Sequence, residues 1–283
     1  MSNTEARDEF AHAAGPFAET TVIRTPTDGL ETERRSIPAG TGQMTVYVAR
    51  PAGKENLPVV VVVSEAFGLH AHIQDIARRF AREGYLAVAP DLMARQGDPQ
   101  SYREVDTLVT DLLQRIPDEQ VMTDLDAAIG WAIGNGGDPT RIGITGYCWG
   151  GRWVWLYAAH ATITAAVAWY GIIDGRRSGA YPDQQLFPRH PIDIANDLRT
   201  PILALHGGQD DAIPLDTIDA MKTAIAERPQ NTVDAEVVVY PEAGHAFFAD
   251  YRETYHRASA QDAWKRALSW LHDHGMCDPP EPR

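Results

Sequence analysis

The stretch RIGITGYCWGG, residues 141–151, is the most informative part of the chain. It opens with the apolar pattern of a β-strand and leads directly into a helical pattern. Between the two lies G-x-C-x-G, in which Gly146 and Gly150 flank Cys148. Glycines at these places permit a tight turn from a strand into a helix. We therefore expect the Cys148 thiol to stand exposed on a strained turn at the carboxyl end of a strand.

Strands and helices alternate on both sides of this stretch. Val59–Val63 is an unbroken β-branched run, as a parallel strand buried on both faces requires. Further strands are expected at 85–90, 165–171, 201–208 and 235–245, and helices at 73–83, 118–133, after 151, after 215 and at 264–271. Earlier runs at 21–26, 32–39 and 43–51 predict antiparallel strands that lead into the sheet.

This order predicts one doubly wound α/β domain, with a mostly parallel sheet and helices on both faces, over residues 21–283. Residues 1–20 are polar and lack clear periodicity, so we expect a loosely ordered N-terminal arm. Two irregular segments, 93–117 and 172–198, interrupt the series. Loops of that length usually cover a functional site.

Composition and charge exclude several classes of protein. The chain has 283 residues, 44% of them hydrophobic, which suits a single large core. Its net charge is -14, so nucleic acids and anionic membranes are repelled. It has two cysteines, Cys148 and Cys277, and no signal-like or membrane-spanning run. We expect a cytoplasmic monomer or homodimer that acts on a small molecule.

A thiol at a helix N-terminus is favoured as the thiolate, the form that acts as a nucleophile. Strand-end nucleophiles of this kind are followed along the chain by an acid and then by a histidine. Asp210 and Asp211 follow one predicted strand, and His245 follows the next. We take His245 as the base and Asp210 as its partner, with Asp211 as the alternative.

These residues resemble the dienelactone hydrolases, or carboxymethylenebutenolidases, a thiol branch of the α/β-hydrolase fold. The resemblance covers most of the chain from about residue 21. It rests on five stretches: SEAFG at 64–68, APDLMARQG at 89–97, GYCWGG at 146–151, HGGQD at 206–210 and EAGHAFFADYR at 242–252. It implies a Cys148, His245, Asp210 triad and matches Glu65 to the family glutamate that contacts the resting thiol.

The resemblance also implies hydrolysis of a small ester or lactone through a thioester. The backbone N–H groups of Ala66 and Trp149 would form the oxyanion hole. Glu65 could accept the thiol proton as substrate enters. No metal or organic cofactor is expected, because His70 and His72 have no third ligand in sequence.

Substrate recognition is less defined by the sequence. The known enzymes hold a substrate carboxylate with arginines, one of them four residues after the triad histidine, where this chain has Ala249. Arg95, Arg103 and Arg252 could replace that anchor, and Tyr147 is a further candidate contact. Two alternatives stay open: a general carboxylesterase, thioesterase or other acyl hydrolase, and a binding protein without catalysis.

Overall fold

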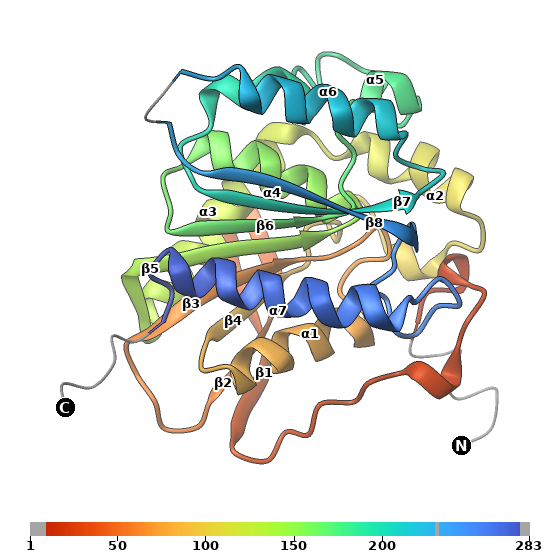
Figure 1. The fold of residues 1–283 in the computed structure, drawn as a ribbon. Coiled ribbons are helices and arrows are strands. Elements are labelled where there is room, and N and C mark those ends of the chain that lie inside the picture. The colour runs from red at the N-terminus through yellow and green to blue at the C-terminus, as the bar shows by residue number, and fades with distance from the viewer. Residues whose placement is uncertain (1–9, 230–231, 278–283) are drawn as a thin grey trace.

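The centre of the fold is β3 (Leu57–Val63), which contains the five consecutive valines and is buried along its whole length. In this computed structural model, which describes residues 10–229 and 232–277, β3 lies between β4 and β5 and is parallel to both (Figure 1). The eight strands follow the order β1-β2-β4-β3-β5-β6-β7-β8. The first two ladders, β1 with β2 and β2 with β4, are antiparallel, and all others are parallel.

The predicted strands and helices form close to their expected positions. The remaining strands are β1 (Leu30–Ala39), β2 (Gly42–Pro51), β4 (Leu86–Pro90), β5 (Gly137–Tyr147), β6 (Ala165–Trp169), β7 (Ile202–Gln209) and β8 (Ala235–Gly244). The helices are α1 (Ala71–Arg82), α2 (Val105–Asp111), α3 (Asp118–Gly134), α4 (Trp149–His160), α5 (Gly175–Ser178), α6 (Leu215–Ala226) and α7 (Arg257–Asp273). The predicted doubly wound α/β fold is confirmed.

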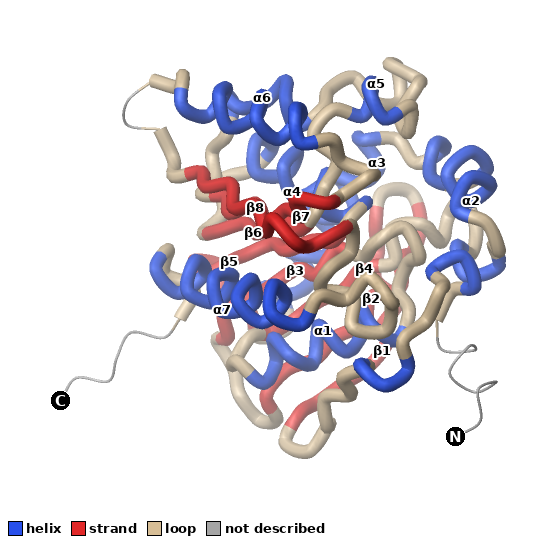
Figure 2. The backbone as a smooth tube through the Cα atoms, turned by 45° about the vertical axis from the view of Figure 1, so that its right-hand side comes forward, coloured by secondary structure: helices blue, strands red, loops and turns tan. Residues whose placement is uncertain are grey.

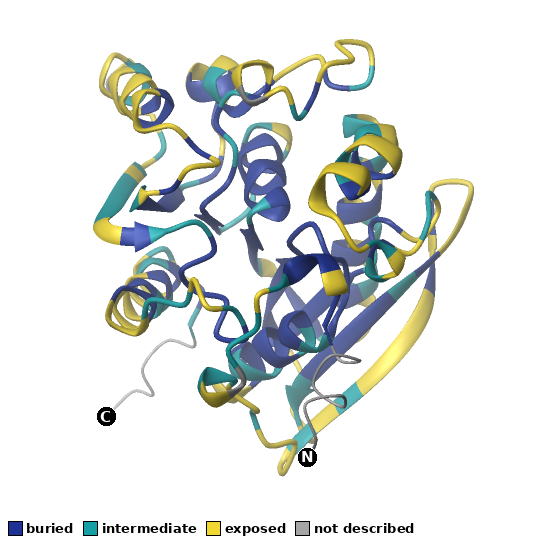
Figure 3. Ribbon diagram, turned by 90° about the vertical axis from the view of Figure 1, so that its right-hand side faces the viewer, coloured by how far each residue is buried: buried dark blue, intermediate teal, exposed yellow. Residues whose placement is uncertain are grey.

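Helices cover the sheet on both faces. α1 and α7 lie on one face, and α3, α4 and α6 lie on the other (Figure 1). Viewed from the side toward which β7 and β8 point, the central strands and the helix surfaces that face them are buried, while the outer helix surfaces are exposed (Figure 3). Among the described residues, no helix combines the length and apolar character needed to cross a bilayer.

The carboxyl ends of the parallel strands lie at one edge of the sheet, and the loops that follow them gather there (Figure 2). Parallel strands in one sheet necessarily bring these ends together. Residues that are far apart in sequence, from the loop after β3 to the loop after β8, therefore become neighbours. This edge holds the candidate site.

The segment 21–26, predicted as a strand, is not part of the sheet. Thr21 ends a 3-10 helix, and the backbone beyond it bonds to side chains of the α1 and α7 face. The Thr25 N–H donates to Asp75 at 2.6 Å, and the Ile23 N–H donates to Asp250 at 3.3 Å. These carboxylates replace the strand partner that the sequence pattern had suggested.

The described part of the N-terminal arm contains buried residues. Residues 1–9 lie outside the described residues, but Phe10, Ala11 and Ala14 are buried. Phe10 stacks on Tyr251, with ring centroids 4.4 Å apart. Within the arm expected over residues 1–20, Phe10 and Phe17 thus pack against the loop after β8.

The two covering segments contain short helices. Residues 93–117 include α2 and two 3-10 helices, η3 (Pro99–Ser101) and η4 (Leu113–Arg115), and bury several leucines. Residues 172–198 include α5 and the 3-10 helix η5 (Pro191–Asp197). Arg152 of α4 holds the second segment by donating to the Arg189 carbonyl at 2.8 Å.

Candidate active site

Cys148 lies on a sharp turn between β5 and α4. Its φ of 53° is in the left-handed region, which costs a residue with a side chain on the order of 1–3 kcal/mol. A Cβ on Gly146 would lie 2.5 Å from the Gly150 carbonyl oxygen, and one on Gly150 would lie 2.5 Å from that of Val63. Only glycine fits at both places, so the G-x-C-x-G pattern is a steric requirement of this turn.

His245 and Asp210 extend a hydrogen-bonded chain from this thiol. His245 Nε2 lies 3.2 Å from Cys148 Sγ, and His245 Nδ1 lies 2.8 Å from Asp210 Oδ2. The other oxygen of Asp210 accepts the N–H groups of Ala212 and Ile213 at 2.9 and 3.0 Å, which fixes the carboxylate. Asp211 is exposed, and Asp210 is the one that faces the imidazole.

The charges of these groups favour a protonated imidazole. Burial opposes the protonation of His245, but the charge interaction with Cys148 and the hydrogen bonds that His245 donates to Asp210 and Cys148 outweigh it and raise the pKa of His245 to about 10. The His245 side chain is 23% exposed, whereas that of Asp210 is fully buried. The imidazole thus connects a buried carboxylate with a surface that solvent can reach.

The expected oxyanion donors belong to the turns that follow β5 and β3. Trp149 is the first residue of α4, where a backbone N–H has no partner within the helix. Ala66 lies in the turn after β3, and the structure gives its N–H no hydrogen-bond partner among the described residues. That turn is closed by Gly68, whose N–H donates to the Glu65 carbonyl at 3.2 Å.

Glu65 is buried behind this turn and bonds to groups other than the thiol. His70 Nε2 lies 2.9 Å from Glu65 Oε1, and the Tyr251 hydroxyl donates to the same oxygen. Burial opposes ionisation of Glu65, but the His70 hydrogen bond and surrounding positive charge lower its pKa to about 2. The predicted contact between Glu65 and the resting thiol is not among the hydrogen bonds of the described residues.

The three candidate arginines lie in different surroundings. Arg95 is bonded to Asp124 and to the Ala39 carbonyl, so its charge is engaged in the structure. Arg103 is exposed. Arg252 is half-buried with its guanidinium 5.7 Å from the centre of the Phe67 ring, and its Nε has no hydrogen-bond partner among the described residues. Arg252 is thus the best placed of the three to receive an anion.

Tyr147 is buried among aromatic side chains. It is 1% exposed and stacks between Trp169 and Phe248, with centroid distances of 5.3 and 5.6 Å. The sequence analysis missed three other residues near the site: His70, Tyr251 and Tyr170. Tyr170 lies at the end of β6 with its ring edge against His245 at 5.4 Å. His70, Tyr251 and Tyr170 all follow a strand, and this position was the signal by which the sequence could have identified them.

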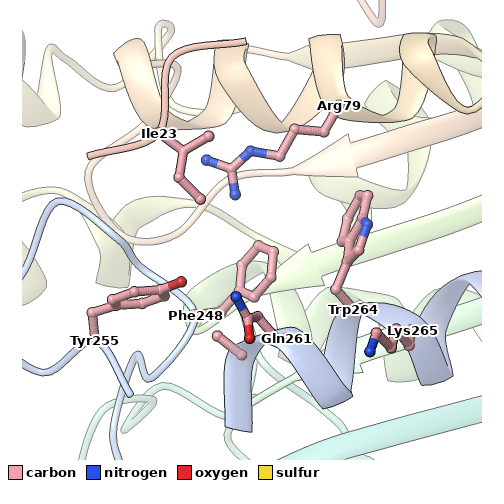
Figure 4. A pocket seen from close by; sticks show the side chains of 8 residues that line it. Ile23, Arg79, Phe248, Tyr255, Gln261, Trp264 and Lys265 are labelled. Atoms are coloured by element: carbon pink, nitrogen blue, oxygen red, sulfur yellow. The ribbon is translucent and has the colours of Figure 1, made fainter. Parts of the chain in front are cut away.

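A separate cavity of about 410 Å³ lies between α1, α7 and the N-terminal segment (Figure 4). Arg79, Phe248 and Trp264 form part of its wall. No member of the Cys148, His245 and Asp210 chain lines this cavity. Phe248 separates the two regions, because it also stacks on Tyr147 beside the thiol turn.

Comparison with known proteins agrees with this geometry. The model of the dienelactone hydrolase family matches residues 44–275. A protein of Escherichia coli (strain K12) that carries the name carboxymethylenebutenolidase is 49% identical over 274 residues, which cover 96% of this chain and 97% of that protein. A Bradyrhizobium protein named as a 2-oxo-3-(5-oxofuran-2-ylidene)propanoate lactonase is 28% identical over 230 residues, covering 81% and 88%.

A crystal structure from Klebsiella pneumoniae, described as a dienelactone hydrolase, superimposes with a TM-score of 0.81 at 48% sequence identity. The match covers 86% of this chain and 98% of that one. The chain therefore belongs to the dienelactone hydrolase family and has the α/β-hydrolase fold, as its motifs predicted. Within that family it is a hydrolase of carboxylic esters.

Proposed function

We propose that this protein hydrolyses a small carboxylic ester or lactone, with Cys148 as the nucleophile, His245 as the acid and base, and Asp210 as the group that orients His245. The observation that carries the proposal is the continuous contact from Cys148 Sγ to His245 Nε2 at 3.2 Å and from His245 Nδ1 to Asp210 at 2.8 Å. A nucleophile, its base and an orienting carboxylate at hydrogen-bond distance are the requirement for this chemistry.

The reaction follows from the positions of these groups. The Cys148 thiolate attacks the carbonyl carbon, and the N–H groups of Ala66 and Trp149 stabilise the oxyanion that forms. The His245 imidazolium gives its proton to the leaving oxygen, and a thioester to Cys148 remains. Neutral His245 then takes a proton from water, which attacks the thioester and releases the acid. In a lactone, the leaving oxygen stays tethered to the acyl chain through both steps, so hydrolysis of the thioester releases a single ring-opened acid.

An anionic lactone is the substrate class that the site favours. The half-buried Arg252 has an unpartnered Nε and lies close enough to Glu65 to influence its ionisation. A carboxylate beside the scissile ring could receive two hydrogen bonds from such a guanidinium. The lactonase name of the Bradyrhizobium relative also specifies an anionic lactone, which supports this choice.

We also place the activity in the cytoplasm, because a free thiol nucleophile is preserved under reducing conditions. Both cysteines, Cys148 and Cys277, are free in the structure.

The test is steady-state hydrolysis of a dienelactone and of p-nitrophenyl acetate. Cys148→Ala should lose activity on both substrates while its circular dichroism spectrum stays unchanged. Cys277→Ser is the matched control, since it removes the other thiol, and it should retain full activity. A folded Cys148→Ala variant that keeps its activity would refute the proposal. Preference for the lactone over the acetate would distinguish a lactonase from a general esterase.

A further inference from the structure

Glu65 is held by donors from two separate loops. His70 lies at the N-terminal end of α1 and its Nε2 is 2.9 Å from Glu65 Oε1. Tyr251 lies in the loop after β8, six residues beyond His245, and its hydroxyl donates to the same oxygen. Glu65, His70 and Tyr251 are each no more than 1% exposed. Glu65 Oε2 has no hydrogen-bond partner among the described residues.

The surroundings of Glu65 favour its charged form in a setting that excludes water. Besides His70 and Tyr251, the titratable and charged groups that act on it or respond to its charge are His72 of α1, Arg252 of the loop after β8, Tyr170 at the end of β6 and Tyr147 at the end of β5. Burial lowers the pKa of His70, although the hydrogen bond to Glu65 and its charge oppose that shift. The Glu65 carboxylate is the one anionic side chain of this group.

The N-terminal segment closes the cluster. Phe10 stacks on Tyr251 at 4.4 Å and places its ring edge-on to His70 at 6.1 Å. An aromatic cover of this kind keeps water from replacing the two donors of Glu65 Oε1. In such an environment a buried carboxylate depends on its hydrogen bonds to remain ionised.

We propose that His70 and Tyr251 are positioning residues of the ester hydrolysis, which act by fixing Glu65 as an immobile carboxylate that ties the turn at residues 64–68 to the loop at residues 245–252. The proposal rests on the proposed function, because it assigns these residues to that same site. Ala66, the expected oxyanion donor, directly follows Glu65, and His245 opens the loop that contains Tyr251. Glu65 Oε1 therefore links the turn that carries the expected oxyanion donor to the loop that begins with His245, and the reaction requires these two parts to keep their relative positions.

This arrangement gives Glu65 a different role from that of a mobile proton acceptor for the thiol. With Oε1 held from two sides, the side chain cannot turn toward Cys148 without losing both hydrogen bonds. The thiol is already paired with His245 at 3.2 Å and does not need a second base. We infer that Glu65 maintains the geometry of the oxyanion turn.

Tyr251→Phe tests the proposal by removing one hydroxyl and little else. Loss of a hydrogen bond to a buried carboxylate should lower kcat by roughly tenfold, with KM changing by less than about twofold. The released carboxylate should also become easier to protonate, so kcat/KM should gain an additional acidic limb that the wild type lacks above about pH 4. Tyr157→Phe is the matched control, because Tyr157 also donates to a carboxylate, that of Asp126 at 2.7 Å, near the far end of α4. It should leave both kcat and the pH profile unchanged.

A second substitution shows whether Tyr251 acts through Glu65. Adding Tyr251→Phe to Glu65→Gln should change kcat by less than about twofold, because the carboxylate that Tyr251 holds is already gone. The proposal is wrong if Tyr251→Phe lowers kcat by the same factor with and without Glu65, or if its pH profile coincides with that of the wild type.

Two further measurements apply if Tyr251→Phe does not fold or if the substrate is wrong. His70→Gln retains an N–H donor and should keep more activity than His70→Leu, and equal losses would contradict the role of the donor. The acid-unfolding midpoint requires no turnover: weaker donors to Glu65 should move it to higher pH, and no shift would overturn the proposal. An inactive wild type with the expected midpoint shift would refute the ester hydrolysis alone.

Discussion

Asp210→Asn changes the charge next to His245 with almost no change in shape. Asp210 Oδ1 can still accept the N–H groups of Ala212 and Ile213, so the loop should keep its conformation. With the amide oxygen kept at that place, the group that faces His245 Nδ1 across 2.8 Å becomes an NH₂ donor. It favours the tautomer of His245 that has the wrong nitrogen protonated.

The size of the effect follows from this one contact. A hydrogen bond to a charged group contributes about 1.5–3 kcal/mol, and each 1.36 kcal/mol of barrier is tenfold in rate. We therefore expect kcat/KM to fall by roughly 10-fold to 100-fold from the lost hydrogen bond, and by more because the tautomer changes as well. The pKa of His245, raised to about 10 by Cys148 and Asp210 against the effect of burial, should also fall. The basic limb of the pH profile should then move to lower pH.

The assay is hydrolysis of p-nitrophenyl acetate from pH 5 to pH 10, with thermal unfolding to verify the fold. Asp211→Asn is the matched control, because it makes the same chemical change at an exposed neighbour. It should stay within about twofold of the wild type. If Asp210→Asn were equally active, or if Asp211→Asn caused the greater loss, the assignment of Asp210 would be refuted.

Three further predictions concern packing, substrate charge and acid stability. Gly150→Ala places a Cβ 2.5 Å from two backbone carbonyl oxygens and should lower Tm by several degrees or prevent folding. A Cβ on Gly130 of α3 meets nothing within 4 Å, so Gly130→Ala should raise Tm slightly. An unchanged Tm for Gly150→Ala would contradict the geometry of the turn. Arg252→Gln should raise KM for an anionic lactone about tenfold or more but leave KM for a neutral ester unchanged. Arg35→Gln, on the exposed side of β1, should change neither KM. Equal effects of Arg252→Gln on both substrates would argue against a carboxylate anchor. The pKa of Glu65 lies at about 2 in the folded chain, below its ordinary 4.5, so Glu65 stabilises the fold above about pH 4.5. This contribution, about 3 kcal/mol, is lost as pH falls toward 2. The free energy of urea unfolding of Glu65→Gln should lack that loss, and the same dependence on pH in the variant and the wild type would disprove it.

The sequence predicted the sheet well because its strands have a strong local signal. Val59–Val63 can be buried on both faces only at the centre of a parallel sheet, and the structure places it there. The segment 21–26 had a similar β-like composition but no partner strand. Its backbone groups are satisfied by Asp75 and Asp250, which lie far along the chain, and no local pattern reports such contacts.

The same distinction, between local sequence signals and contacts of distant residues, explains which residues of the site could be predicted. Cys148 and His245 could be named from the sequence because glycines and strand ends mark them. The choice between Asp210 and Asp211 required coordinates, since both residues occupy the same short loop. The partners of Glu65 also required coordinates: Tyr251 is 186 residues away in sequence, and His70 looked at most like part of a weak metal motif.

His245, the proposed base, follows a strand at the margin of the sheet. β8 pairs with β7 alone and has more exposed residues than the central strands, whereas β5, which leads to the proposed nucleophile, is enclosed between β3 and β6. Marginal elements open at lower free energy than enclosed ones. If β8 separates from β7, His245 leaves the thiol while the rest of the sheet can persist. We therefore expect mild denaturation to abolish turnover before it removes the bulk of the secondary structure.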